Sequence, residues 1–250
     1  CGNYLDAFAQ TKGYSTILSA ASYASSSNAI YKLEGTYASD ARDNTWISFY
    51  NILNEVKANT RPPIGCFSDM IPELQQRFIE AANTPSDINE HLPMMNILTK
   101  VCNHVTEFGV RWATSATVWF NNPVVLRGYD IVAYPPAIDL FNLAKKLGRD
   151  CELIMQDTGD LQSIEQTDLL FIDSLHTYDH VKKELKLADF VNKFIVLHDT
   201  ELFGKAGEDG STPGLMQAIQ EFLRDNPAWT VMEHRKNNNG LTVLVRRDFL

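Results

Sequence analysis

The 250-residue chain has few cysteines, a deficit of basic residues and no long apolar run. The four cysteines, Cys1, Cys66, Cys102 and Cys151, form no CxxC or CxxH pair, which argues against a cysteine-based zinc site and predicts reduced thiols in a cytosolic protein. No stretch approaches the ~18 uninterrupted apolar residues of a membrane-spanning helix. Lys and Arg total 22 against 31 Asp and Glu, and the net charge of -9 disfavours nucleic acid as a partner.

The remaining composition is that of a globular protein, with 44% hydrophobic and 21% charged residues. Residues 1–85 are predicted to be a helical extension or lid, and residues 86–250 to be the main domain. Within the first part, apolar residues recur at helical spacing over 47–56, and a second helix is predicted over 72–82. A third helix is predicted over 88–100, after a stretch of turn and cap residues.

Beyond residue 101, short apolar runs alternate with helical stretches, which is typical of a parallel sheet covered on both faces. The predicted strands are 104–108, 124–129, 151–155, 169–172 and 194–197, and the predicted helices between them are 115–120, 137–147 and 178–188. A helix over 215–223 and two strands over 229–234 and 241–246 follow, and Asn239-Gly240 between these strands is a strong hairpin signal. The sequence thus predicts a Rossmann-like, doubly wound, mostly parallel seven-stranded sheet that ends in an antiparallel hairpin.

Ligands of a doubly wound sheet bind outside the carboxyl ends of its strands, so the residues there are the candidate site residues. The first strand leads into Glu107 and Gly109, where glycine lets the backbone approach a ligand, and the helix near Ser115 offers free N–H groups to an anion. The second strand leads to Asp130, 23 residues after Glu107, a spacing suited to a carboxylate whose two oxygens accept both hydroxyls of a ribose. The third leads to Asp157, in a polar turn that could contact a purine edge.

The fourth and fifth strands bring more carboxylates and imidazoles to the same edge. Asp173 ends the fourth strand, and His176 is a candidate general base near neutral pH. His198 and Asp199 end the fifth strand, which neighbours the fourth in the predicted order. Two carboxylates and an imidazole there either hold a divalent cation or form a hydrogen-bonded network without metal. The segment 201–214, with four glycines, is either a mobile loop over the substrate or a plain surface excursion.

These residues, in this order, resemble class I S-adenosylmethionine (SAM)-dependent methyltransferases, and most closely the branch that includes macrocin O-methyltransferases and proteins named cephalosporin hydroxylases. The resemblance covers roughly residues 86–250. It implies a methyltransferase fold, SAM as the cofactor, and a small-molecule or carbohydrate hydroxyl as the acceptor. The stretches that carry it are Val105–Ser115, Gly128–Asp130, Phe171–Leu185, Val196–Phe203 and Asn238–Arg246.

The resemblance also implies a role for each candidate residue. The cofactor-binding positions it implies are Glu107, Gly109, Arg111, Ser115, Asp130, Asp157 and Asp173. Asp173 also falls where relatives place a metal ligand, as do His198 and Asp199, so Mg²⁺ is a candidate ion. His176 falls where macrocin-type relatives place a candidate base, which makes His176 and Asp173 the predicted catalytic residues.

One stretch departs from the relatives' pattern, because Trp112-Ala113-Thr114 stands where many carry a second glycine. The small Ala113 would let the turn survive, whereas the bulky Trp112 puts the pose of the cofactor in question. Two other functions therefore stay open. One is a nicotinamide-dependent oxidoreductase, which the absence of GxGxxG argues against, and the other is a non-catalytic binding module that keeps the fold. Residues 1–85 could also form a homo-oligomer.

Overall fold

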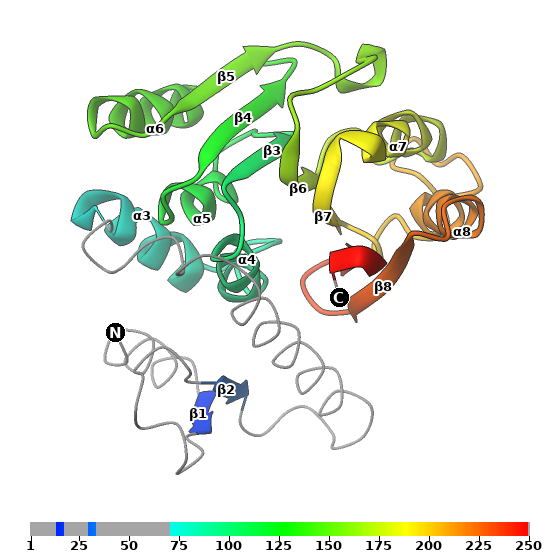
Figure 1. Ribbon diagram of the computed structural model, residues 1–250, viewed down its shortest axis with the longest axis horizontal. Coiled ribbons are helices and arrows are strands. Elements are labelled where there is room, and N and C mark those ends of the chain that lie inside the picture. The colour runs from blue at the N-terminus through cyan, green and yellow to red at the C-terminus, as the bar shows by residue number, and fades with distance from the viewer. Residues whose placement is uncertain (1–13, 18–29, 34–70, 250) are drawn as a thin grey trace. The chain divides into compact units, whose positions relative to one another are not determined.

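A seven-stranded sheet organises the larger part of the computed structural model, which describes residues 14–17, 30–33 and 71–249 (Figure 1). The strand order is β5-β4-β3-β6-β7-β9-β8; the first five strands are parallel, and β9 is antiparallel to both of its neighbours. The strands are β3 (His104–Phe108), β4 (Val125–Asp130), β5 (Cys151–Met155), β6 (Thr167–Ile172), β7 (Val191–His198), β8 (Trp229–Arg235) and β9 (Leu241–Arg246). This arrangement confirms the predicted mostly parallel sheet with a C-terminal antiparallel hairpin.

Helices cover both faces of the sheet. Helices α3 to α6 lie on one side and α7 and α8 on the other (Figure 1). The helices are α3 (Pro72–Asn83), α4 (Leu92–Thr99), α5 (Ala116–Phe120), α6 (Pro135–Lys146), α7 (Tyr178–Leu185) and α8 (Leu215–Asp225), with 3-10 turns η2 (Thr158–Asp160), η3 (Lys186–Phe190) and η4 (Arg247–Phe249). Strand β6 is buried at every residue because both layers cover it, which explains its apolar run over 169–172.

The predicted helix over 88–100 begins only at Leu92, so its predicted start is wrong by one turn. Pro93 lies in the first turn of α4, where its missing N–H leaves no bond unmade, and its ring would clash with the carbonyl of residue 89 in a longer helix. Ser86 and Asn89 close a turn ahead of the helix instead. Ser86 Oγ accepts a hydrogen bond from Asn89 N at 3.1 Å, and Asn89 Oδ1 accepts one from Ser86 N at 3.0 Å.

The chain divides into two compact units, Cys1–Asn54 and Glu55–Leu250. In the first unit, β1 (Tyr14–Ile17) and β2 (Ile30–Leu33) form an antiparallel pair that the sequence does not predict. The helical spacing over 47–56 lies outside the described residues. A helical lid over residues 1–85 therefore stays a prediction.

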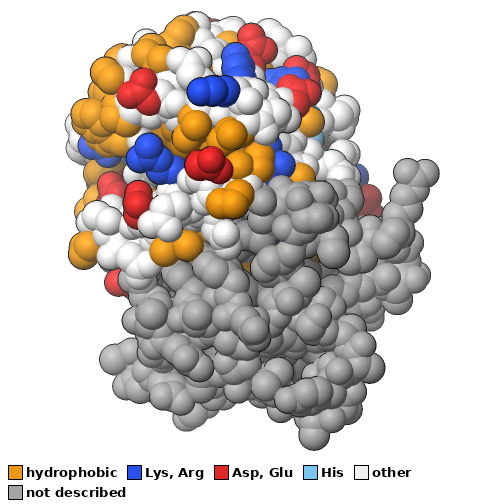
Figure 2. Space-filling model, turned by 90° about the vertical axis from the view of Figure 1, so that its left-hand side faces the viewer, with side chains coloured by type: hydrophobic (Ala, Val, Ile, Leu, Met, Phe, Trp, Pro, Cys, Tyr) orange, Lys and Arg blue, Asp and Glu red, His pale blue; other side chains and the backbone are white. Residues whose placement is uncertain are grey.

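The described surface carries side chains of several kinds. Figure 2 shows apolar, acidic and basic side chains interspersed on the described part of one face. Of the helices within the described residues, none could serve as a transmembrane segment.

Cys102 and Cys151 are buried and form no disulfide. Burial raises the pKa of both thiols, that of Cys151 to about 11, so both keep their protons at neutral pH. Cys1 and Cys66 lie outside the described residues.

Candidate active site

The carboxyl ends of the five parallel strands lie at one edge of the sheet, where the strand ends and the loops after them carry the candidate residues. Backbone hydrogen bonds join three of these ends. Gly109 N donates to Tyr129 O at 2.9 Å, and Asp173 N donates to Phe108 O at 2.8 Å. The turn after β3 is therefore tied to the ends of both neighbouring strands, as the predicted strand order requires.

The turn between β3 and α5 uses left-handed backbone at three positions. Gly109 has a φ of +85°, and a Cβ there would lie 2.6 Å from the carbonyl carbon of Asp173, so no side chain fits. Arg111 and Ala113 have φ values of 46° and 63°, and Ala113 N donates to Val110 O at 2.7 Å. Ala113 thus preserves the turn at the position where many relatives carry a second glycine. Its left-handed conformation costs about 1–2 kcal/mol because Ala113 has a Cβ.

The two bulky side chains of this turn lie on its outside. Trp112 is 53% exposed and packs against the ring of Tyr134, with the ring centroids 4.9 Å apart. The guanidinium of Arg111 lies 3.8 Å from Asp87 Oδ2, and both side chains are more than half exposed. An exposed pair at this distance contributes little to stability. Neither bulky residue is packed inside the turn, and a role for Arg111 in binding the cofactor stays a prediction.

Asp130 organises the turn through its carboxylate. Oδ2 accepts hydrogen bonds from Val110 N at 3.0 Å and Arg111 N at 2.7 Å, and Oδ1 accepts one from Val132 N at 2.9 Å. A carboxylate has about four lone-pair positions, so one on Oδ1 remains for a further donor. The sequence-based expectation uses both oxygens for a ribose diol, whereas this geometry leaves room for one hydroxyl while the carboxylate shapes the turn.

Under the cofactor role that the resemblance implies for Asp130, replacing it with asparagine should weaken SAM binding by about tenfold or more, because one amide oxygen replaces two acceptors that serve three backbone N–H groups. The free energy of unfolding should fall by only about 1–3 kcal/mol, the range for a lost charged hydrogen bond. Calorimetric titration of SAM and thermal unfolding check both values. Asp139→Asn, the same chemical change on the exposed side of α6, is the matched control. Unchanged affinity would remove Asp130 from the cofactor site.

Glu107 lies fully buried in β3, next to the turn. Its Oε1 accepts a hydrogen bond from the Ser115 hydroxyl, and its Oε2 has no hydrogen-bond partner among the described residues. Burial raises the pKa of Glu107 to about 8, although Ser115 and Trp119 act in the opposite direction, so the carboxyl group is mostly protonated at pH 7. The Ser115 hydroxyl is committed to Glu107, and contacts of either side chain with a cofactor stay predictions.

Glu107 should make the fold less stable as the pH rises from 4.5 to about 8. The unfolded carboxyl loses its proton near 4.5 and the folded one near 8, so the folded state binds more protons across this window. Glu107→Gln keeps the neutral shape, should flatten this dependence and should be the more stable protein at pH 8. Thermal unfolding across the window tests this, with exposed Glu152→Gln as the control. Parallel pH curves for wild type and Glu107→Gln would contradict the assignment.

The polar turn after β5 is anchored by a buried carboxylate that carries no sequence signal. Asp157 closes η2 by accepting a hydrogen bond from Gly159 N at 2.8 Å. Glu184, fully buried on α7, accepts hydrogen bonds from Thr158 Oγ1 and Ser174 Oγ, each at 2.5 Å. Glu184 therefore links the Asp157 turn to the loop that follows β6. A glutamate on a helix is usually solvated, so its burial is visible only in the tertiary structure. A contact of Asp157 with the cofactor stays a prediction.

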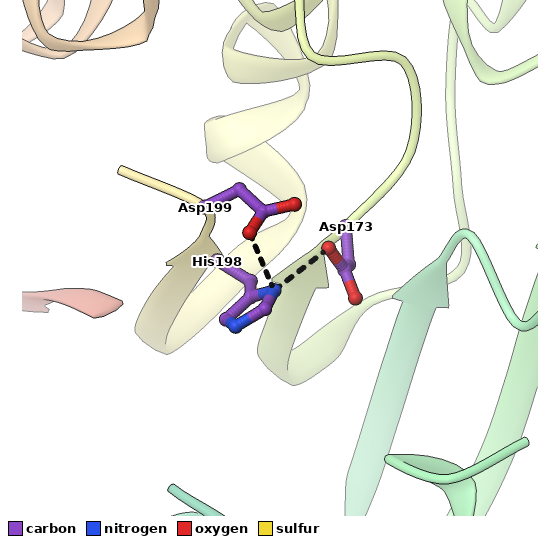
Figure 3. Close-up of side chains that lie close together, drawn as sticks. All are labelled: Asp173, His198 and Asp199. Carbon is purple, nitrogen blue, oxygen red and sulfur yellow. Dashed lines mark hydrogen bonds and ion pairs between the residues drawn. The ribbon is translucent and has the colours of Figure 1, made fainter. Parts of the chain in front are cut away.

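Five side chains meet beyond β6 and β7, and we call them the acidic cluster: Asp173, His176, His198, Asp199 and Glu208. His176 Nε2 lies 3.1 Å from Asp173 Oδ1 and 3.2 Å from Asp199 Oδ2. His176 Nδ1 lies 3.0 Å from Glu208 Oε2. His198 Nδ1 lies 3.1 Å from Asp173 Oδ1 and 3.5 Å from Asp199 Oδ1 (Figure 3). Four of these residues are predicted from the strand ends. Glu208 belongs to the glycine-rich segment 201–214, and only the position of that segment beside the predicted site could have identified it.

The carboxylates hold positive charge on both imidazoles of the acidic cluster. Burial lowers the pKa of His176 and His198, but hydrogen bonds to Asp173 and the negative charges around the rings outweigh it and raise each pKa to about 9. The same pairing keeps the pKa of Asp173 well below its usual range in spite of burial, whereas burial raises that of Asp199. At neutral pH the cluster is therefore a network of imidazolium and carboxylate groups.

Backbone carbonyls fix the ring of His198. Its Nε2 lies 3.1 Å from the carbonyl oxygens of both Asp87 and Asn238, which orients Nδ1 toward the carboxylates. Asp173, His198 and Asp199 each offer a ligand atom, and these atoms lie within 4.8 Å of one another. Asp199 Oδ1 is buried and has no hydrogen-bond partner in the described part of the chain. The donor set and this oxygen, which accepts no hydrogen bond from the described residues, fit a divalent cation.

Comparison with known proteins finds a family that matches part of the chain and solved structures with a similar fold. Residues 142–250 match the family described as Rhamnosyl O-methyltransferase/CmcI. A Staphylococcus aureus protein assigned as a caffeoyl-CoA O-methyltransferase aligns with a TM-score of 0.50 and 13% identity, over 78% of this chain and 98% of its own. At that identity it shows a shared fold alone. The family match and this fold confirm the resemblance predicted from the sequence.

Two further solved structures are similar at lower scores. Podospora anserina PaMTH1, a methyltransferase, aligns with a TM-score of 0.48 and 17% identity, over 86% of this chain and 100% of its own. The N-methyltransferase NodS from Bradyrhizobium japonicum aligns with a TM-score of 0.48 and 13% identity, over 70% of this chain and 97% of its own. No curated protein sequence matches the chain.

Proposed function

We propose that the chain is a SAM-dependent methyltransferase that transfers the methyl group of SAM to a hydroxyl group of a small-molecule or carbohydrate acceptor. The name of the family that residues 142–250 match includes a rhamnosyl O-methyltransferase, which supports a sugar hydroxyl as the acceptor. The family match and the fold favour this function over the nicotinamide-dependent oxidoreductase. The net charge of -9 favours an acceptor other than nucleic acid.

The observation that carries this proposal is the place of His176. Asp173 approaches Gly109 so closely that no side chain fits between them, and His176 follows Asp173 by three residues. His176 Nε2 lies 3.1 Å from the Asp173 carboxylate, and the backbone of Asp173 packs against the turn at which the resemblance places the methionine portion of SAM. In methyl transfer, the acceptor oxygen forms a bond to the methyl carbon, the bond from that carbon to sulfur breaks, and the hydroxyl loses its proton. We assign His176 to take this proton in its neutral form, which a pKa of about 9 leaves as a minor fraction at neutral pH.

Alignment of the acceptor oxygen with the methyl group supplies much of the rate of such a displacement. Glu208 and Phe203 hold the His176 ring in place, since Glu208 Oε2 lies 3.0 Å from Nδ1 and the Phe203 ring is stacked at a centroid distance of 5.1 Å. Both come from the segment 201–214, so a substrate that orders this segment would also order the base. We assign the segment to the acceptor side of the site.

A divalent cation would be held by Asp173, His198 and Asp199. Bound there, it would lower the pKa of an acceptor hydroxyl and offset the carboxylate charge that keeps His176 protonated. We therefore assign Asp173 and Asp199 a part in both the route with His176 as the base and the route with a bound cation. The same two carboxylates face His176 and would face the ion.

Calorimetric titration of SAM and S-adenosylhomocysteine into the full chain, with and without magnesium, tests the cofactor first. Saturable binding of both is expected, and a magnesium effect would favour the metal-assisted route. Formation of S-adenosylhomocysteine with a panel of neutral sugars and phenols then tests the reaction. No binding of either compound would overturn the proposal and leave a non-catalytic binding module as the better function.

A further inference from the structure

We propose that His198 makes the ligand set Asp173, His198 and Asp199 selective for a first-row transition-metal ion over Mg²⁺ and Ca²⁺. The inference rests on the proposed function only in placing a cation at this site, and it names which ion the site takes. Mg²⁺ and Ca²⁺ prefer oxygen ligands, whereas imidazole nitrogen suits zinc, iron, nickel and copper. One nitrogen among three protein ligands therefore favours the second group.

The orientation of the His198 ring supports a nitrogen ligand at Nδ1. The carbonyl oxygens of Asp87 and Asn238, each 3.1 Å away, take the hydrogen-bond donor at Nε2. A second ring nitrogen that is engaged in this way fixes the tautomer of a metal-ligating histidine and its direction. Because the ring is almost completely buried, no solvent competes for these positions.

The carboxylate of Asp199 gives independent support, because one of its oxygens is buried without a hydrogen-bond partner among the described residues. The residue is 6% exposed, and Oδ1 has no hydrogen-bond partner among the described residues although it lies 3.5 Å from His198 Nδ1. Figure 3 shows this carboxylate and that of Asp173 on either side of Nδ1. Asp199 also has a φ of 57°, a strained backbone conformation of the kind that clusters at ligand-binding and active sites. When His198 Nδ1 has given up its proton, this nitrogen and the two carboxylates are three electron-pair donors that converge on one point, and a metal ion would satisfy them together.

His176 is the second imidazole in reach of this site, so a test has to separate it from His198. Its Nε2 lies 3.1 and 3.2 Å from the same two carboxylates. It is held on its other side by Glu208, whose Oε2 lies 3.0 Å from Nδ1 and whose backbone N donates to the His176 carbonyl at 3.0 Å. These contacts keep His176 with the segment 201–214, whereas His198 belongs to the end of β7.

Titration of Co²⁺ and Mg²⁺ into the full chain without SAM measures the selectivity. We expect wild type to bind Co²⁺ about 100-fold more tightly than Mg²⁺. His198→Asp turns the site into one with oxygen ligands alone, and the ratio of the two dissociation constants should fall by about tenfold or more. His176→Gln is the matched control, and it should keep the wild-type ratio. Equal affinity of wild type for the two ions, or an unchanged ratio in His198→Asp, would overturn the proposal.

Proton NMR of the Co²⁺-loaded protein identifies the nitrogen ligand directly. A metal-bound His198 should give one strongly shifted, exchangeable resonance from its Nε2–H. His198→Gln places an amide near the same backbone carbonyls and removes Nδ1, so the resonance should vanish, whereas His176→Gln should retain it. Thermal unfolding shows that each variant is folded. If the resonance persists in His198→Gln or disappears in His176→Gln, the assignment to His198 is wrong. If no acceptor is methylated, the metal affinities and the NMR resonance are unaffected, because neither measurement uses SAM or an acceptor. The proposal on metal selectivity and the proposed methyl transfer can therefore be refuted independently.

Discussion

Replacing His176 with alanine should lower methyl-transfer turnover by about 100- to 10,000-fold, the range in which a general base contributes. The affinity for SAM should change little, because the ion-pair partners of the side chain, Asp173, Asp199 and Glu208, lie outside the β3 turn. Turnover with a saturating acceptor measures the first effect and calorimetric titration of SAM the second. The expected signature is a loss confined to turnover.

The control for this variant is His234→Ala. His234 is also paired with a carboxylate, since its Nε2 lies 2.8 Å from Glu201 Oε1, but it belongs to β8 and is not part of the acidic cluster. His176→Ala also removes one imidazole from Asp173 and Asp199, which keep His198, and from Glu208. His176→Gln, which keeps a polar side chain of similar reach, is therefore measured beside it. Wild-type turnover in both His176 variants would show that another group takes the proton.

Replacing Gly109 with alanine should destabilise the fold and abolish cofactor binding. The left-handed φ of +85° costs a residue with a Cβ about 1–2 kcal/mol, and overlap with the Asp173 carbonyl group adds about 1–3 kcal/mol. Relieving the overlap would move the β3 turn away from β6, and the turn is where we expect SAM. Thermal unfolding and SAM titration of the same preparation measure the two effects.

Gly148→Ala separates backbone strain from overlap. Gly148 has nearly the same conformation, with a φ of +88°, but a Cβ there would meet no atom within 4 Å. This control should lose only the strain contribution of about 1–2 kcal/mol and should bind SAM like wild type. An equal loss of unfolding free energy in Gly109→Ala and Gly148→Ala would show that the Gly109 turn relieves the overlap with Asp173 at no cost in stability. The close contact of this turn with β6 would then not be needed for the stability of the fold.

The periodicity of apolar residues was enough to predict the sheet and most of its helices. Strand β9 has its predicted bounds, Leu241–Arg246, because alternation and an Asn-Gly turn are local signals. The start of α4 was mispredicted, since apolar spacing continued back to Ile88 while Pro93 set the helix start at Leu92. The pair β1 and β2 was missed because two four-residue strands give too short a pattern to detect.

The parallel order of the strands also predicted which side chains gather at one edge. Asp173, His176, His198 and Asp199 lie together as that order requires, because parallel strands end at the same edge and each residue stands within a few positions of a strand end. This part of the site follows from sequence position and from one rule of topology.

The partners of these residues were decided by the tertiary structure alone. Glu208 reaches His176 across 32 positions, and the carbonyls of Asp87 and Asn238 reach His198 across 111 and 40. Backbone groups carry no side-chain signal, and contacts between distant segments depend on how the loops close. The sequence by itself thus determined the sheet, its edge and the chemical groups placed there. Only the folded chain decided which atoms face one another, because hydrogen-bond partners and ring orientations are set by packing between segments that no local pattern connects.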